Sequence, residues 1–200
     1  GADGGAADAP RSTAPRGTDL ILRDLKTGTE LNIGNVSVWS FNKSGRYLAL
    51  TIDAADQAGN GLQLRDMQTG AISSLETDKT FYERMAWTQE GDAIIALKGH
   101  DDRGWRERIY AVVGFTGLDK SGAPKKVSYD PAKDTAFPKD MSISGNRAAT
   151  FTEARDAFIF GIAKLTKVER PAGRGGAGAG AAAEGADAPP GPPAQAAAQN

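Results

Sequence analysis

The chain has 200 residues, a formal net charge of −1 from 24 basic and 25 acidic residues, and no cysteine. The balanced charge provides no electrostatic footprint for nucleic acid or for an anionic membrane surface. The lack of cysteine excludes disulfides, thiolate catalysis and cysteine-based zinc sites. No stretch approaches the ~20 consecutive apolar residues of a membrane-spanning helix.

The two ends differ in composition from the middle. Residues 1–17 and 170–200 contain no Val, Ile, Leu, Met, Phe, Trp or Tyr. Alanine and glycine bury too little surface to offset the entropy of ordering a backbone, which costs roughly 1–2 kcal/mol per residue. We therefore predict a disordered linker at 1–17, a folded domain at 18–168, and a low-complexity disordered tail or insertion at 169–200.

The middle of the chain is predicted to be a series of short strands. Leu20 and Leu22 precede a Thr-Gly turn at 27–28, an apolar run at 36–41 precedes a turn at 42–45, and a further run follows at 47–52. Short apolar runs bounded by Gly, Asn and Asp clusters are typical of strands. Many such strands at this spacing predict an all-β sandwich, barrel or propeller.

An internal repeat distinguishes among these folds. The motif Arg-Asp-x-x-Thr-Gly at 23–28 recurs 42 residues later at 65–70. A second motif, an aromatic residue followed four positions later by Gly and then a strand, begins at Phe41 and recurs 46 residues later at Trp87. A fainter third copy begins at Phe151. Two independent repeats of this length match the four-stranded blade of a β-propeller, which spans roughly 40–50 residues.

The repeat predicts where the blades lie. They are a partial first blade at about 18–34, a complete second at about 36–77, a third at about 81–130, and a fourth at about 138–168. Phe41 and Trp87 should end the inner strands and be largely buried between blades. Propellers close with about 4–8 blades. The expected fold is therefore a partial β-propeller of about three antiparallel four-stranded blades, a fragment of a larger ring.

Two segments carry a family resemblance. Residues 39–49 (WSFNKSGRYLA) and 64–70 (LRDMQTG) resemble propeller blades of prolyl oligopeptidase-type serine peptidases, and also TolB-like and WD-like propellers. The blade in that family usually reads aromatic-Ser-Pro-Asp-Gly-Arg-Tyr-Leu-Ala, so residues 42–44 depart from it at the turn. Residues 151–162 also resemble a blade of bacterial members of the peptidase family, which favours a periplasmic or secreted location.

The resemblance implies a non-catalytic propeller segment that shapes or gates access to an α/β-hydrolase domain outside this chain. The family's Ser-Asp-His triad lies in that domain, so no catalytic residue carries over. The partners implied are the remaining blades, the hydrolase domain, and a peptide or protein ligand. The alternative is a binding or scaffold propeller without an enzyme domain, and a weaker third is an enzyme acting through loops at the central channel.

The sequence offers few groups for chemistry of its own. His100 is the only histidine, and no Gly-x-Ser-x-Gly nucleophile elbow is present, residues 142–145 (SISG) lacking its first glycine. The dinucleotide-like Gly pattern at 173–178 has no strand before it and no helix after it. Consecutive His100, Asp101 and Asp102 cannot easily converge on one metal ion. We expect no catalytic residue, no cofactor and no metal site in this chain.

The charged segment 98–108 is the candidate interface. It gathers several ionisable groups around Trp105, and Trp and Arg are favoured as interface anchors. The alternative is a charged hairpin whose tryptophan covers a blade edge. The residues proposed for the interface loop are His100, Asp101, Asp102, Arg103, Trp105 and Arg106.

Overall fold

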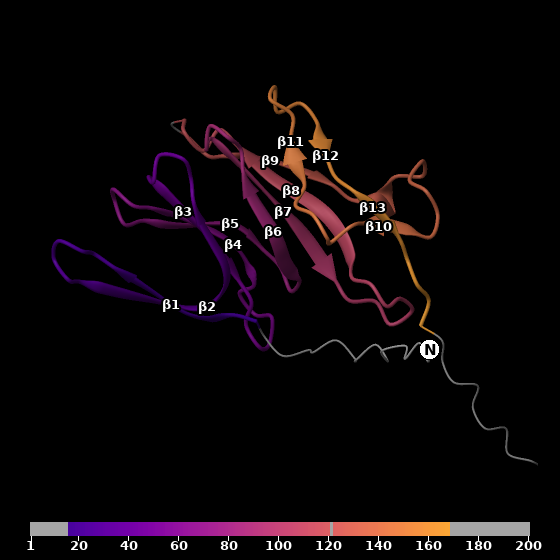
Figure 1. Cartoon of the computed structure of the whole chain (residues 1–200), viewed down its shortest axis with the longest axis horizontal. Coiled ribbons are helices and arrows are strands. Elements are labelled where there is room, and N and C mark those ends of the chain that lie inside the picture. The colour runs from indigo at the N-terminus through magenta and orange to yellow at the C-terminus, as the bar shows by residue number, and fades with distance from the viewer. Residues whose placement is uncertain (1–15, 121, 169–200) are drawn as a thin grey trace, which may run out of the picture. The chain divides into compact units, whose positions relative to one another are not determined.

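The computed structural model describes residues 16–120 and 122–168, which form strands, turns and one short 3-10 helix (Figure 1). The predicted low-complexity tail and most of the predicted linker lie outside these residues. Residues 16 and 17, the last two of the predicted linker, are described and contact the folded domain. A Cβ on Gly17 would lie 2.4 Å from the Asn35 carbonyl oxygen, and Arg16 forms ion pairs that are described below.

The strands form consecutive antiparallel sheets. The first sheet contains β1 (Thr18–Arg23), β2 (Glu30–Phe41), β3 (Tyr47–Ile52), β4 (Gly61–Asp66) and β5 (Ile72–Thr77), in that order. The second contains β6 (Phe81–Trp87), β7 (Ala93–His100), β8 (Ile109–Thr116) and β9 (Lys125–Tyr129). After η1 (Pro131–Lys133) come the pairs β10 (Met141–Ile143) with β13 (Ile162–Lys164) and β11 (Thr150–Phe151) with β12 (Phe158–Ile159).

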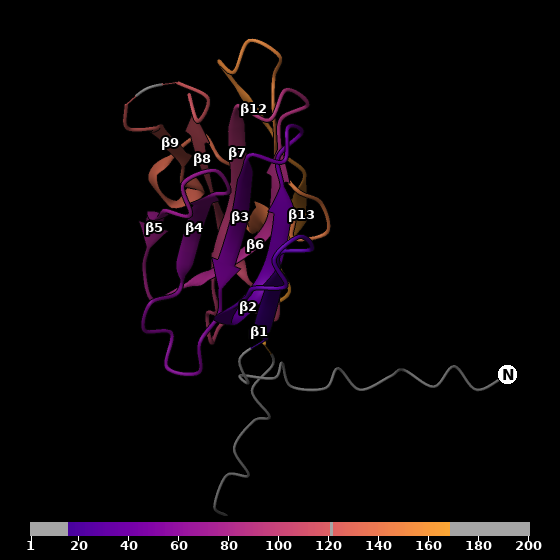
Figure 2. The same cartoon turned by 90° about the vertical axis from the view of Figure 1, so that its left-hand side faces the viewer.

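The sheets pack face to face like successive blades. In Figure 2, β2 and β6 lie on one side and the outer strands β5 and β9 on the other. The core between the first two sheets is formed by Ala49, Leu62, Leu64, Tyr82, Ile94, Ala96, Val113, Phe115 and Leu118. A second core joins the second sheet to the last strands through Ile95, Leu97, Tyr110, Val112, Ile143 and Ala149. The predicted fold class, antiparallel blades of a partial β-propeller, is confirmed.

The predicted partial first blade is not a separate sheet. Its two strands belong to a hairpin of β1 with the first half of β2, and β2 continues without a break into the inner strand of the next blade. The pairing of β2 with β3 shifts between Val36 and Val38, and Asn35 has a φ of 58°. Such a bulge bends a strand. The hairpin consequently packs Leu20, Leu22 and Ile33 against one face of the first sheet.

The predicted fourth blade contains only an inner hairpin among the described residues. β10 pairs with β13 and β11 pairs with β12, and the Ser144 N–H donates to the Gly161 carbonyl, 2.8 Å away, between the two pairs. The strand that carries β10 and β11 is interrupted at 145–149, where more residues occur than on the partner strand. This interruption forms one wall of the site described below.

The aromatic–Gly repeat makes the same turn in all three copies. The side chain after each aromatic residue accepts the N–H five positions further on: Asn42 Oδ1 from Tyr47 (3.0 Å), Thr88 Oγ1 from Ala93 (3.2 Å), and Thr152 Oγ1 from Ala157 (3.2 Å). The left-handed position is filled by Gly45 (φ 71°), Gly91 (φ 74°) and Arg155 (φ 58°). The departure from the family pattern at 42–44 therefore keeps the turn.

Asn42 has a second role that explains its burial. Its Nδ2 donates to the Gly91 carbonyl in the next blade at 3.1 Å. The turn of the second sheet is linked onward in the same way, because Arg155 Nη2 lies 2.7 Å from Asp92 Oδ1. The three inner turns are thus connected from blade to blade.

The Arg-Asp-x-x-Thr-Gly copies also form equivalent turns. Asp66 Oδ1 accepts the N–H groups of Gln68 (2.8 Å) and Thr69 (3.2 Å), and Asp24 Oδ1 accepts the corresponding two N–H groups of its own turn at 2.8 Å each. These backbone hydrogen bonds hold the pKa of both carboxyls below their usual range.

Phe41 and Trp87 end the inner strands β2 and β6, as predicted, but their burial differs. Trp87 is half-buried against the core between the sheets, and its indole N–H donates to the Ser40 carbonyl at 3.2 Å. Phe41 is 40% exposed, and its ring contacts Trp39, which is 54% exposed. The prediction of a largely buried Phe41 is wrong because the β1–β2 hairpin covers only part of that face.

Candidate functional site

The predicted interface loop lies between β7 and β8. His100 ends β7 and is exposed, and Asp102, Arg103 and Arg106 are also exposed. Asp101 accepts a hydrogen bond from Arg108 Nε at 2.9 Å. Most of the loop's charged side chains therefore face solvent, where a partner could reach them.

Trp105 is the half-buried residue of this loop, and it contacts the end of the last hairpin. It forms an antiparallel bridge with Lys167, whose Nζ lies 5.8 Å from the centre of the indole. The Arg106 N–H donates to the Thr166 carbonyl at 2.8 Å. The loop thus makes a blade-to-blade contact within the chain, and contact with a separate partner stays a prediction.

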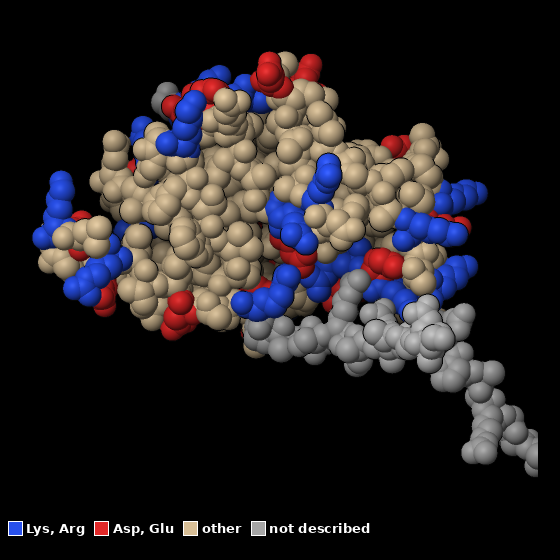
Figure 3. Space-filling view, viewed as in Figure 1, with Lys and Arg blue, Asp and Glu red and all other residues tan. Residues whose placement is uncertain are grey.

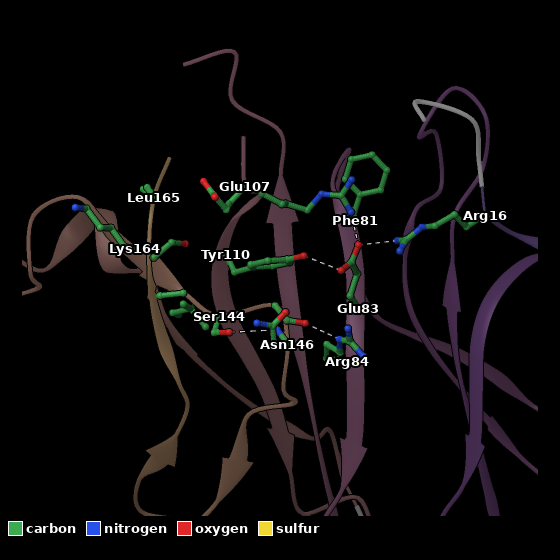
Figure 4. A pocket seen from close by; sticks show the side chains of 15 residues that line it. Arg16, Phe81, Glu83, Arg84, Glu107, Tyr110, Ser144, Asn146, Lys164 and Leu165 are labelled. Atoms are coloured by element: carbon green, nitrogen blue, oxygen red, sulfur yellow. Dashed lines mark hydrogen bonds and ion pairs between the residues drawn. The ribbon is translucent and has the colours of Figure 1, made fainter. Parts of the chain in front are cut away.

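A charged cluster that the sequence analysis did not single out centres on Glu83 of β6 (Figure 4). The Glu83 carboxylate pairs with Arg108 and with Arg16 (2.8 Å), and it accepts the Tyr110 hydroxyl at 2.7 Å. The Arg108 guanidinium stacks 3.6 Å from the centre of the Phe81 ring. Burial acts to lower the pKa of Arg108, but hydrogen bonding to Asp101 and the charge of Glu83 outweigh it and raise the pKa.

Arg16 extends this cluster to the first sheet. Its Nε lies 3.2 Å from Oδ2 of Asp53, a residue that is only 2% exposed and directly follows β3. One arginine therefore bridges a carboxylate next to the first sheet and a carboxylate in the second. The pairing joins residues far apart in the chain, so no local sequence pattern could have identified it.

Arg84, next to Glu83, lies in a bulge of the inner strand. The pairing of β6 with β7 shifts between Glu83 and Ala86, and Arg84 has a φ of 53°. A left-handed residue of this kind costs roughly 1–2 kcal/mol. The Arg84 Nε donates to the Gly145 carbonyl at 2.6 Å. The only signal in the sequence was the charged pair Glu83-Arg84 in the middle of an otherwise apolar and aromatic strand.

A cleft of about 570 Å³ opens beside this bulge. It lies between β6 and β8 on one side and the interrupted last hairpin on the other. Ser142 lines it and is 4% exposed, and its hydroxyl has no hydrogen-bond partner among the described residues. Its lining residues include Arg16, Glu83, Arg84, Glu107, Arg108, Tyr110, Ser142, Ser144, Asn146 and Lys164.

A second cleft of about 390 Å³ surrounds Lys98. The Lys98 ammonium lies 2.9 Å from Glu76 and 2.7 Å from Asp78, and Glu76 also pairs with Lys126. Burial opposes ionisation of Glu76, but its lysine partners outweigh it and lower the pKa; hydrogen bonding to Lys98 lowers the pKa of Asp78. Desolvation raises the pKa of the nearby Tyr82 to about 12. These groups link β5 to β7 and β9 across the blade interface.

Two patterns considered in the sequence do not form a site among the described residues. Ser142 lies in β10 and not at a strand-to-helix turn, so SISG does not form a nucleophile elbow. Within 16–120 and 122–168, no three His, Asp or Glu residues are grouped as metal ligands. The dinucleotide-like pattern at 173–178 lies outside the described residues.

One face of the molecule has a broad uncharged area. Figure 3 shows no Lys, Arg, Asp or Glu over much of the left half of this face, while charged side chains lie at its edges and in a group near the middle. Among the residues that the structure describes, no helix is long and apolar enough to cross a membrane.

No protein-family model and no curated protein matches this sequence. The acylaminoacyl peptidase of Pyrococcus horikoshii is similar in structure, with 11% identity and a TM-score of 0.40 over 66% of this chain and 22% of that one. The β-propeller domain of the Trilobed protease from Pyrococcus furiosus, which has an open velcro topology, is similar with 11% identity and a TM-score of 0.41. That match covers 76% of this chain and 49% of the other. The blade arrangement itself follows from the strand order and packing described above.

Proposed function

We propose that this chain is a non-catalytic segment of the propeller of a prolyl oligopeptidase-like serine peptidase. In this proposal the propeller shapes or gates the access of substrates to a hydrolase domain outside the chain. Two features support it: residues 39–49 and 64–70 resemble the blades of that family, and they occupy the inner hairpin and the outer turn of one four-stranded meander.

The observation that carries the proposal is the packing of the three equivalent aromatic residues. Trp87 packs against the core between the sheets and bonds to Ser40 of the preceding one. Phe151 packs on the second sheet so closely that a Cβ on Gly114 would lie 2.5 Å from its ring. Phe41, the first copy, is exposed. The same residue in two later copies contacts a preceding blade, so the Phe41 face fits a further blade.

In this proposal the chain therefore forms part of the lining of the propeller's central channel. Its inner strands β2 and β6 line one side of the stack (Figure 2), and in a closed ring that side would face the central channel. A channel of this kind excludes large substrates by size. The hydrolytic groups would come from the separate domain.

The proposal is tested by assaying the protein encoded by the longer reading frame that contains these residues. It should react with a fluorophosphonate probe for active serines, whereas the 200-residue chain should not. It should also cleave a chromogenic dipeptide or tripeptide much faster than an unfolded chain of about 100 residues. Labelling of the 200-residue chain, or equal rates on the two substrates, would contradict the proposal.

A matched pair of variants tests the gating role. Trp39→Ala with Phe41→Ala loosens the face that a further blade would cover, so cleavage of the long substrate should rise while cleavage of the short one stays constant. Ile159→Ala, at a residue that is 61% exposed in the last hairpin, should change neither rate.

The alternative is a binding propeller without a hydrolase domain. The observation that favours it is the cleft beside Glu83 and Arg84, because concave sites in which polar groups converge are where ligands bind. Two results together would establish this alternative. The longer reading frame would encode further blades and no Gly-x-Ser-x-Gly segment, and its protein product would not react with the fluorophosphonate probe.

A further inference from the structure

We propose that the cleft beside Arg84 binds a carboxylate, either the C-terminus of a peptide or an acidic side chain. The inference goes beyond the peptidase proposal and does not need it, because it concerns the described residues of this chain alone. It rests on the charges in the cleft, on its uncommitted donors and on the strained backbone that presents them.

The first step is the balance of charge in the cleft. Glu83 is neutralised by Arg16 and Arg108, and Glu107 accepts the Thr166 N–H at 2.6 Å. Arg84 uses only its Nε, which donates to the Gly145 carbonyl. Its two terminal nitrogens have no partner among the described residues. Of the three arginines that line the cleft, Arg84 is thus the one whose guanidinium has no ion pair among the described residues.

The second step is geometry. With Nε fixed on the Gly145 carbonyl at 2.6 Å, the guanidinium is held in one orientation against the loop that carries Ser144 and Asn146 (Figure 4). A guanidinium with its two terminal nitrogens free can form a bidentate pair with a carboxylate, which adds directional specificity to charge.

The third step is the set of neutral donors on the opposite wall. The Ser142 hydroxyl is buried without a partner, and a buried polar group without a partner is unusual in a native structure. The Ser144 Oγ accepts the Asn146 N–H at 3.2 Å, which leaves its own hydrogen free to donate. These hydroxyls could complete the coordination of a carboxylate held by Arg84.

The fourth step is the strain at Arg84. A bulky residue with a φ of 53° in a strand is held by its surroundings and not by its own preference. Bulges that redirect a side chain are common beside functional sites. Here the bulge at Glu83–Ala86 lies in the inner strand and places Arg84 at the cleft.

The experiment measures the binding of three tripeptides to the 200-residue chain by NMR titration. They are acetyl-Ala-Ala-Ala with a free carboxylate, its C-terminal amide, and acetyl-Ala-Asp-Ala amide. We expect at least one carboxylate peptide to bind at least ten times more tightly than the neutral amide. Binding of only the first identifies a chain terminus as the ligand, and binding of the third identifies an acidic side chain. Equal binding of all three, or no binding of either acid, would overturn the proposal.

Variants assign the binding to this cleft. Arg84→Asn keeps a residue that tolerates the left-handed conformation and should abolish the preference for carboxylates. Arg84→Lys keeps the positive charge but loses the two parallel N–H donors of the guanidinium, so it should retain part of the preference for carboxylates. Arg103→Gln removes an exposed arginine from the β7–β8 loop and should have no effect. Wild-type discrimination in Arg84→Asn, with a native circular dichroism spectrum, would refute the assignment.

Discussion

The two faces of the first sheet differ in how completely their apolar side chains are buried. One face packs against the second sheet and buries Ala49, Leu62 and Leu64 almost completely. On the other face the β1–β2 hairpin packs against a cluster that includes Leu48, Leu50 and Ile52, but Phe41 and Trp39, the β2 partners of Leu48 and Leu50, stay exposed. Since paired residues of neighbouring strands share a face, burial here depends on the neighbouring blade and not on the residue.

The sharpest test of this difference is a pair of aromatic truncations. Trp87→Ala should destabilise the chain by about 3 kcal/mol, because it removes packing between two blades and a hydrogen bond. Phe41→Ala should cost less than about 1 kcal/mol, because Phe41 lies on the open face. Urea unfolding followed by circular dichroism measures both. Equal losses would mean that the two faces are equally packed.

The Lys98 network tests whether ion pairs add to the buried interface. The pKa values of Glu76 and Asp78 are lowered from 4.5 and 3.8 respectively, so their contribution is complete above the unfolded values and is lost as the pH falls through the folded values. Lys98→Met should cost about 2 kcal/mol at neutral pH, because it leaves Glu76 with one partner in a partly buried site. It should also flatten the decline in stability below about pH 5.

A matched control for this network is Lys43→Met. Lys43 pairs with Glu90 at 3.3 Å, but both side chains are more than half exposed, and such pairs contribute between about 0 and 1 kcal/mol. Thermal melts at pH 3, 5 and 7 should therefore be unchanged in Lys43→Met. A Lys98→Met variant with wild-type acid sensitivity would show that the network is not stabilising.

Equivalent glycines provide a smaller test of the same asymmetry. A Cβ on Gly91 would lie 2.9 Å from the Lys43 backbone nitrogen, whereas a Cβ on Gly45 would meet nothing within 4 Å. Gly45→Ala should cost about 1 kcal/mol from backbone strain alone. Gly91→Ala should cost roughly 1 kcal/mol more, because it also pushes the two turns apart. Chemical denaturation measures the difference, and equal costs would argue against the turn-to-turn contact.

The effect on stability of Trp39→Ser combined with Phe41→Ser should also stay below about 1 kcal/mol, because both rings lie on the open face. Exposed apolar faces and unpaired strand edges promote association. The parent chain should therefore self-associate at high concentration, and this double variant should do so much less. Sedimentation velocity over a range of concentrations measures both. A parent chain that stays monomeric throughout would remove the reason for assigning another blade to this face.

Much of the fold could be predicted because it is encoded over short distances. The turn at 42–47 needs the left-handed φ of Gly45 and the Asn42 side chain within the same six residues, and the Asp66 turn depends on N–H groups two and three positions away. Strand positions followed from the alternation of apolar runs with such turns. The repeat then predicted stacked antiparallel blades of a partial propeller, which the structure confirms.

The sequence by itself therefore determined the strands, the turns and the order of the blades, because these depend on local backbone preferences and on apolar runs. Only the tertiary structure decided which copy of an aromatic residue is buried, and that the first hairpin bends onto its own sheet. It also brought Arg16, Asp53, Glu83 and Arg108 together, and it placed Arg84 at a cleft. Each of these features depends on contacts between residues tens of positions apart, which local preferences do not encode.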